Sequence, residues 1–171
     1  MPLTVERRYR FSAAHRYFRP EWSEEENLRR FGKCAFAPGH GHNYRLTIEV
    51  RGDVDPVTGF VVDLSLLDQW IQSRIIEPLD HRHLNEAIPE FASGGLIPSS
   101  ENLVLWIRAQ LRDGLPNSVT LASVRVEEDD DLAAGWREGG GRLTAILERP
   151  TIAPCPPMLS QPTGFCCACA A

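Results

Sequence analysis

Several features are scarce in this chain of 171 residues, and each absence excludes a class of protein. No apolar run approaches the roughly 18 residues of a membrane span, and the first residues contain no apolar signal-peptide core. Positive charge is not in excess, since 18 Lys and Arg stand against 23 Asp and Glu, whereas general nucleic-acid binding needs clustered positive charge. No Gly-x-Gly-x-x-Gly run indicates a nicotinamide site. We therefore expect a cytoplasmic protein that binds neither membranes nor nucleic acid.

Cysteine is scarce in the body of the chain, where Cys34 stands alone. The other four, Cys155, Cys166, Cys167 and Cys169, fall in the last seventeen residues. An odd total of five and no secretion signal argue against a disulfide framework. The proline-rich segment 150–171 lacks periodicity, so we expect a disordered tail behind a single folded domain over residues 1–149.

Hydrophobic periodicity predicts an α+β fold in the order β-β-α-α-β-β. The alternating segments predict strands over 3–15, 43–52, 119–128 and 142–149. Apolar residues at spacings of three and four predict a helix over 64–76 and a second that begins at Ser99 or Ser100.

Local signals set the helix limits and the connections. Asp63 is expected to cap the first helix, and Pro78 is expected to end it. Residues 16–33 read as a long connection with at most one helical turn, and residues 79–98 as a loop. The first two strands then form a hairpin whose long loop carries functional residues.

The five histidines are clustered, and three of them predict a metal site. His40 and His42 alternate at the start of the second strand, so both imidazoles point to one face, and hairpin pairing brings His15 beside them. Three neutral imidazoles with one open position match catalytic zinc. A redox metal that prefers oxygen ligands fits less well, because no carboxylate is evident among the three.

Cys34 and the Asp80-His81 pair are further candidates. Cys34 lies in the loop just before His40, where it is either a fourth, structural ligand or a catalytic thiolate beside the ion. Asp80 can orient the imidazole of His81, which is an arrangement suited to proton transfer.

These motifs together resemble the 6-pyruvoyltetrahydropterin synthase family. The matching segments are Phe11–Arg16, Glu25–Leu28 leading to Phe31–Cys34, Gly39–Tyr44, Leu79–Asn85, Ser99–Asn102 and Val124–Glu128. The resemblance covers about residues 4–149. It implies the tunnelling fold, which is a four-stranded antiparallel sheet with two helices on one face. It also implies a homo-oligomer, with sheets joined into trimers and two trimers stacked into a hexamer.

The resemblance also implies an activity. Members convert 7,8-dihydroneopterin triphosphate to 6-pyruvoyl-tetrahydropterin and release triphosphate. By motif, His15, His40 and His42 would hold Zn²⁺, Cys34 would take a side-chain proton, and Asp80 with His81 would relay protons.

The resemblance further implies substrate-binding carboxylates. Glu128 matches the residue that anchors the pterin, with Glu127 ranked second because it faces the other side of the strand. Glu101 matches a second acidic position near the pterin. The candidates for binding the triphosphate are Arg16, Lys33 and Arg82.

Three alternatives stay open. The related 6-carboxytetrahydropterin synthases of queuosine biosynthesis act on the same substrate with the same residue types. The spacer Ala35–Gly39 and the stretch leading to Cys34 favour the pyruvoyl product over the carboxy product. A zinc-dependent pterin-binding protein without turnover is the second alternative. A purely structural zinc protein, in which Cys34 closes the site, is the third.

Overall fold

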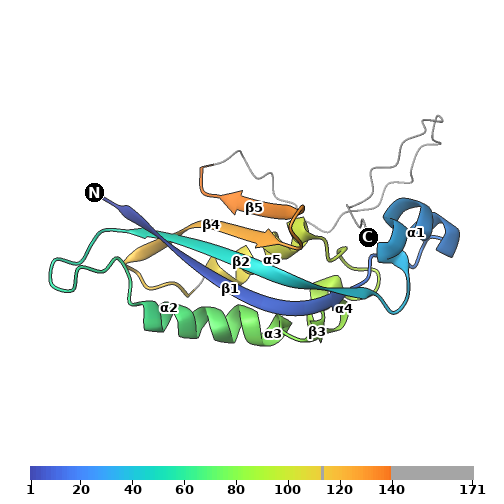
Figure 1. Cartoon of the computed structure of the whole chain (residues 1–171), viewed down its shortest axis with the longest axis horizontal. Helices are drawn as coiled ribbons and strands as arrows, with labels where there is room; N and C mark the ends of the chain where they lie inside the picture. Colours follow the sequence, from blue (N-terminus) through green and yellow to red (C-terminus); the bar gives the residue numbers. More distant parts are fainter. Residues whose placement is uncertain (113, 140–171) are drawn as a thin grey trace.

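The computed structural model describes residues 1–112 and 114–139 (Figure 1), where one sheet carries the functional residues. Its strands are β1 (Leu3–His15), β2 (His40–Gly52), β3 (Arg82–His83), β4 (Val119–Glu127) and β5 (Ala133–Arg137). They lie in the order β3-β1-β2-β4-β5, antiparallel except that β3 runs parallel to β1. The predicted α+β fold is confirmed, with five strands in this part of the chain rather than four.

The fourth predicted strand, over 142–149, lies outside the described residues. The strand that follows β4 is β5, which the sequence analysis missed because its Ala-Ala-Gly-Trp-Arg sequence contains few strong strand formers. A tight turn joins β4 and β5. In this turn the Asp129 carboxylate accepts hydrogen bonds from the backbone N–H groups of Asp131 and Leu132.

The helices are longer and more numerous than the pattern indicated. They are α1 (Glu24–Phe31), α2 (Leu64–Ile71), α3 (Glu77–Leu79), α4 (Leu84–Ala87) and α5 (Ser100–Arg112), with the 3₁₀ segments η1 (Gly32–Ala35) and η3 (Pro89–Phe91) and the π-helical segment η2 (Gln72–Ile76). The connection 16–33 thus contains α1, whose Ser23 cap accepts from the Glu26 N–H. The loop expected over 79–98 contains α4 and η3.

The first long helix begins as predicted but does not end as predicted. Asp63 caps α2 by accepting from the N–H groups of Ser65 and Leu66. The helical path continues through η2 and α3 alongside β1, so Pro78 lies inside the last turn rather than after it (Figure 1). The wider π-helical turn before Pro78 leaves room for a ring that an α-helix interior would exclude.

The two faces of the sheet differ in polarity. One face is covered by α2 and α5, and its core includes Phe11, Leu46, Ile48, Val50, Val124 and Val126 from the strands, with Leu67, Ile71, Leu103 and Ile107 from the helices. The other face is polar, with ion pairs between Arg45 and Glu127 and between Arg137 and Glu49. This alternation is that of an antiparallel sheet with one buried face. No helix in the described part of the chain has the length and apolarity of a membrane span.

Candidate functional site

The paired ends of β1 and β2 bring the three predicted metal ligands together. His15 lies opposite His40 in the ladder, and His42 lies opposite Ala13. The imidazole centroids are 4.8 Å apart for His15 and His40, 5.0 Å for His15 and His42, and 4.8 Å for His40 and His42. The hairpin register therefore produces the predicted convergence.

Hydrogen bonds to His15 fix which of its ring nitrogens can bind a metal. Nδ1 lies 3.2 Å from the carbonyl oxygen of Pro98 and 3.2 Å from the Tyr44 hydroxyl. Because a carbonyl only accepts, Nδ1 carries the proton and Nε2 keeps its lone pair. That Nε2 atom lies 3.2 Å from Nε2 of His40.

Burial keeps these imidazoles in the form that binds metals. His15 is fully buried, and desolvation, together with the neighbouring His42 and His40, lowers its pKa to about 3. Desolvation also lowers the pKa of His40 and of His42. Neutral imidazole is the metal-binding form, so the cluster does not need to lose protons before it takes up an ion at neutral pH.

A carboxylate lies among the histidines, and the expectation that none does was wrong. Oε1 of Glu128 is 3.1 Å from Nε2 of His42 and 3.7 Å from Nε2 of His15. Glu128 follows the end of β4, so only the packing of β4 against β2 brings it to the cluster. It is 3% exposed, and desolvation raises the pKa of its carboxyl.

The donor atoms fit a metal ion. Two groups that share His15 have ligand atoms within 4.8 Å of one another: His15, Cys34 and His40, and His15, His42 and Glu128. Nε2 of His42 is buried and has no hydrogen-bond partner among the described residues, so this orphaned atom is available to an ion. Imidazole, carboxylate and thiolate are all zinc ligands, so the residues present suit zinc.

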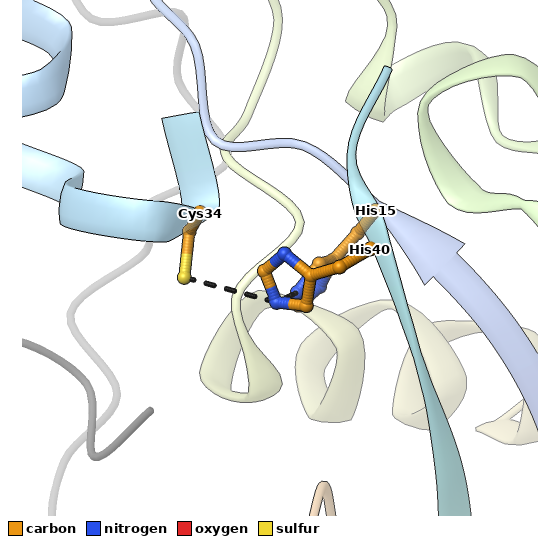
Figure 2. A group of neighbouring side chains, drawn as sticks. All are labelled: His15, Cys34 and His40. Carbon is orange, nitrogen blue, oxygen red and sulfur yellow. Dashed lines mark hydrogen bonds between the residues drawn. The ribbon is translucent and has the colours of Figure 1, made fainter. Parts of the chain in front are cut away.

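Cys34 lies beside this cluster, in η1. Figure 2 shows its side chain directed at His40, and Sγ is 3.9 Å from Nε2 of that residue. The sequence predicts a loop here, but Cys34 lies in a 3₁₀ turn and is fully buried. Its carbonyl accepts from the Tyr17 N–H at 2.8 Å, and Nε of Arg16 donates to the neighbouring Ala35 carbonyl at 2.8 Å. These contacts hold the thiol within reach of the metal ligands.

Asp80 and His81 form a pair, as predicted, but the pair is exposed, whereas His15 of the metal cluster is buried. Oδ2 of Asp80 is 2.9 Å from Nδ1 of His81, whose side chain is 81% exposed. Oδ1 of Asp80 accepts from the Ser12 N–H, and the His81 N–H donates to the Ser12 carbonyl. The hydrogen bond from Ser12, followed by that from His81, lowers the pKa of Asp80. The pair is therefore fixed to β1, whereas Cys34 adjoins His40.

The remaining predicted residues take different positions. Glu127 points to the polar face and pairs with Arg45 and Arg125, while Glu128 points to the cluster. Glu101 is exposed at the start of α5, and its charge contributes to the raised pKa of Glu128. The triphosphate candidates also differ, because Arg16 is engaged with Ala35, whereas Lys33 and Arg82 are exposed.

Two supporting residues were not identified from the sequence. The Ser100 hydroxyl donates to Oε2 of Glu128, and Tyr44 contacts Nδ1 of His15. Tyr44 continues the alternation of His40 and His42 on the same strand face, which is a signal that was present in the sequence. Ser100 was interpreted only as a candidate helix cap, and nothing in its local sequence indicates a contact with Glu128.

Comparisons with known proteins agree with this geometry. The family model for 6-pyruvoyl tetrahydropterin synthase matches residues 4–138. The chain is 42% identical over 127 residues to the 6-pyruvoyl tetrahydrobiopterin synthase of Homo sapiens, covering 74% of this chain and 86% of that protein. A relative with another activity is the dihydroneopterin monophosphate aldolase of Pyrococcus furiosus, which is 29% identical over 121 residues, 71% of this chain and 85% of that protein.

A solved structure supports the same assignment. The 6-pyruvoyl tetrahydropterin synthase of Caenorhabditis elegans matches with a TM-score of 0.73 and 34% identity, covering 80% of this chain and 96% of that one. The match to the family model spans the sheet, the histidine cluster and the Asp80-His81 pair. The chain therefore belongs to the 6-pyruvoyl tetrahydropterin synthase family.

Proposed function

We propose that the chain is a zinc-dependent lyase that converts 7,8-dihydroneopterin triphosphate to 6-pyruvoyl-tetrahydropterin and releases triphosphate. Family membership supports an enzyme that acts on a pterin. The observation that carries the proposal is the buried Cys34 thiol, 3.9 Å from a histidine of the candidate metal cluster. A thiol at this position, beside the candidate ligands, is placed to take a proton from a substrate bound at the metal.

Each proposed role comes from the family resemblance and is supported by the position of a side chain. Bound zinc supplies Lewis-acid polarisation of the substrate's side-chain hydroxyls, which acidifies the neighbouring carbon-bound hydrogens. His15, His40 and His42 hold the ion, and Cys34 takes a side-chain proton. The reaction is an internal redox isomerisation combined with elimination of triphosphate, so it needs no external oxidant or reductant.

The proton relay and substrate binding are assigned to other groups. Asp80 orients the imidazole of His81, which exchanges protons with the substrate side chain. Glu128 and Glu101 are carboxylates that can accept hydrogen bonds from the pterin N–H groups. The exposed cations Lys33 and Arg82 are better placed for the triphosphate than Arg16, whose guanidinium already holds the Ala35 carbonyl.

We also propose a homo-oligomer, a trimer or a hexamer. β3 pairs with only Ala13 and Ala14 of β1, so most of that edge of β1 has no paired strand among the described residues. Exposed strand edges pair readily with other strands, and His81 lies exposed near this edge. Analytical ultracentrifugation tests the proposal, and a monomer at micromolar concentration would contradict it.

The test of activity is the product. Zinc-loaded protein is incubated with 7,8-dihydroneopterin triphosphate, and the products are identified by mass spectrometry, with Cys34→Ala as the matched control. We expect the mass of 6-pyruvoyl-tetrahydropterin from the wild type and little from the variant. The 6-carboxytetrahydropterin mass with acetaldehyde would instead assign the queuosine branch, and a side chain shortened by aldol cleavage would assign the activity named for the Pyrococcus relative.

Two outcomes would reject an enzymatic role. If the substrate is not converted but binds tightly to both the wild type and the Cys34→Ala variant, the chain is a zinc-dependent pterin-binding protein without turnover. Unfolding on removal of zinc, together with loss of zinc from Cys34→Ala, would make the site structural with Cys34 as a ligand. Circular dichroism before and after chelation measures this second outcome.

A further inference from the structure

The position of Glu128 among the histidines has a consequence for the metal centre. We propose that the Glu128 carboxylate is itself a metal ligand in the substrate-free protein, so that imidazoles and one carboxylate hold the ion. This inference rests on the metal centre of the proposed function but not on its reaction. It adds a resting-state role to a residue that the family resemblance assigns to the pterin.

The spacing of the donor atoms supports ligation. Zinc bonds to imidazole nitrogen and carboxylate oxygen of about 2.0–2.2 Å place neighbouring ligand atoms of a tetrahedron roughly 3.3–3.6 Å apart. Oε1 of Glu128 lies 3.1 Å from Nε2 of His42 and 3.7 Å from Nε2 of His15. Nε2 of His15 in turn lies 3.2 Å from Nε2 of His40. The carboxylate oxygen therefore has the separation expected of a ligand that shares an ion with His15 and His42, whereas His40 groups with His15 and Cys34.

The contact between His42 and Glu128 is not a hydrogen bond. Although the two atoms are 3.1 Å apart, Nε2 of His42 is buried and has no hydrogen-bond partner among the described residues. In the tautomer of His42 that carries its proton on Nδ1, Nε2 presents its lone pair beside the lone pairs of the carboxylate oxygen. Two such donors lie side by side when both point at one cation.

The other carboxylate oxygen is already engaged. Oε2 of Glu128 accepts from the hydroxyl of Ser100, which is itself buried. The backbone N–H of Glu128 donates to the Leu132 carbonyl at 3.0 Å, which fixes the start of the side chain. Carboxylates that bind a metal through one oxygen commonly accept a hydrogen bond from a supporting group through the other, as Oε2 does here. Each carboxylate oxygen has two lone pairs, so the same residue can still accept hydrogen bonds from a pterin that enters the site.

A carboxylate ligand changes the chemistry of the centre. It lowers the net charge of a divalent centre by one, and it adds oxygen to a nitrogen-rich ligand set. His15, His42 and Glu128 form a two-histidine, one-carboxylate group, which also suits metals that prefer oxygen ligands. The affinity of the protein for Fe²⁺ should therefore be measured beside its affinity for Zn²⁺.

The first test uses the metal alone. The dissociation constant for Zn²⁺ is measured by competition with a chromophoric chelator, without any pterin, for the wild type, Glu128→Gln and Glu127→Gln. We expect Glu128→Gln to bind zinc about 100-fold more weakly or worse, since loss of even a supporting residue costs about 10–100-fold. The matched control Glu127→Gln removes the same charge one residue away, where the side chain pairs with Arg45, and should change the constant by less than about threefold.

Graded variants and a direct structure complete the test. Ser100→Ala, which removes only the supporting hydroxyl, should weaken zinc binding by about 10-fold. A crystal structure of the wild type with zinc should show Oε1 of Glu128 about 2.0–2.2 Å from the ion, and it requires no variant to fold. A wild-type affinity in Glu128→Gln, or a zinc–oxygen distance beyond about 3 Å, would overturn the inference. Because no pterin is present, an absence of turnover would leave the result unaffected.

Discussion

Two histidine-containing regions of this protein differ in nearly every physical respect. The side chains of His15, His40 and His42 converge with Glu128 at the paired ends of β1 and β2, and His15 has no exposed surface. His81, by contrast, is 81% exposed and touches one carboxylate, that of Asp80. Burial and convergence suit the binding of a cation by neutral imidazoles, whereas exposure and a single oriented partner suit proton exchange. The same residue type therefore serves two kinds of chemistry because its surroundings differ.

The largest expected effect comes from breaking the buried region. In His42→Ala, we expect zinc binding to weaken by at least about 100-fold and turnover to fall below detection, because one ligand is lost. Zinc content by mass spectrometry and the pterin assay measure the two effects together. Full activity without bound metal would contradict the zinc centre.

Replacing Cys34 separates metal binding from proton transfer inside the buried region. Cys34→Ala should keep zinc and fold but lose about 10²–10⁴-fold in turnover, because a general base contributes a factor of this size. The control is Cys34→Ser, which keeps the size and a polar atom but replaces the thiol with a hydroxyl, a much weaker acid. Loss of zinc stoichiometry in Cys34→Ala would show that the thiol is a ligand.

Replacing His81 tests the exposed region. His81 has a positive φ of 56°, a region that Asn enters more readily than most residues with a side chain, so Asn is the substitution chosen. We expect His81→Asn to reduce turnover by about 100-fold while the zinc dissociation constant stays the same, because the exposed His81 side chain contacts Asp80 rather than a candidate metal ligand. A matching loss of zinc affinity would mean that the two regions are one site.

The pH dependence of folding stability tests the burial of His15 in the metal-free protein. Burial lowers the pKa of His15 from 6.5 to about 3, so the unfolded chain binds a proton there that the folded chain rejects. The stability from His15 is therefore complete above about pH 6.5 and is lost as the pH falls toward 3, with a slope near 1.4 kcal/mol per pH unit. Urea denaturation at several pH values measures the slope.

The raised pKa of the Glu128 carboxyl acts in the opposite direction. Protonated Glu128 favours the folded state, and this contribution is lost as the pH rises through its raised pKa. Comparison with His15→Gln isolates the contribution of His15, because Glu128 is present in both proteins. An identical slope in the two proteins would contradict the lowered pKa of His15.

The smallest expected effect concerns neither region. The residues proposed for the site run from His15 to Glu128, so removal of residues 151–171 should change zinc affinity and turnover by less than about twofold. The pterin assay and sedimentation of the truncated chain check this. A large fall in turnover, or loss of the oligomer, would give the C-terminal segment a function.

The predictions from local sequence succeeded where a local pattern dominates. Alternation placed β2, and its pairing with β1 set His15 opposite His40, because hairpin register follows from the alternating strands. Asp63 was identified as a cap from its own type and position. The predictions failed where local signals were weak or overridden, as at β5, with its small residues, and at Pro78, which a π-helical turn accommodates.

The sequence by itself determined the histidine pairs, the cysteine before them and the family to which the chain belongs, since these depend on residue type and short spacing. Only the tertiary structure decided that Glu128 and Ser100 lie at the cluster. It also decided that Cys34 is buried and His81 exposed. The reason is that such contacts join β4 and α5 to β1 and β2, and pairing between distant segments depends on how whole elements pack rather than on any local pattern.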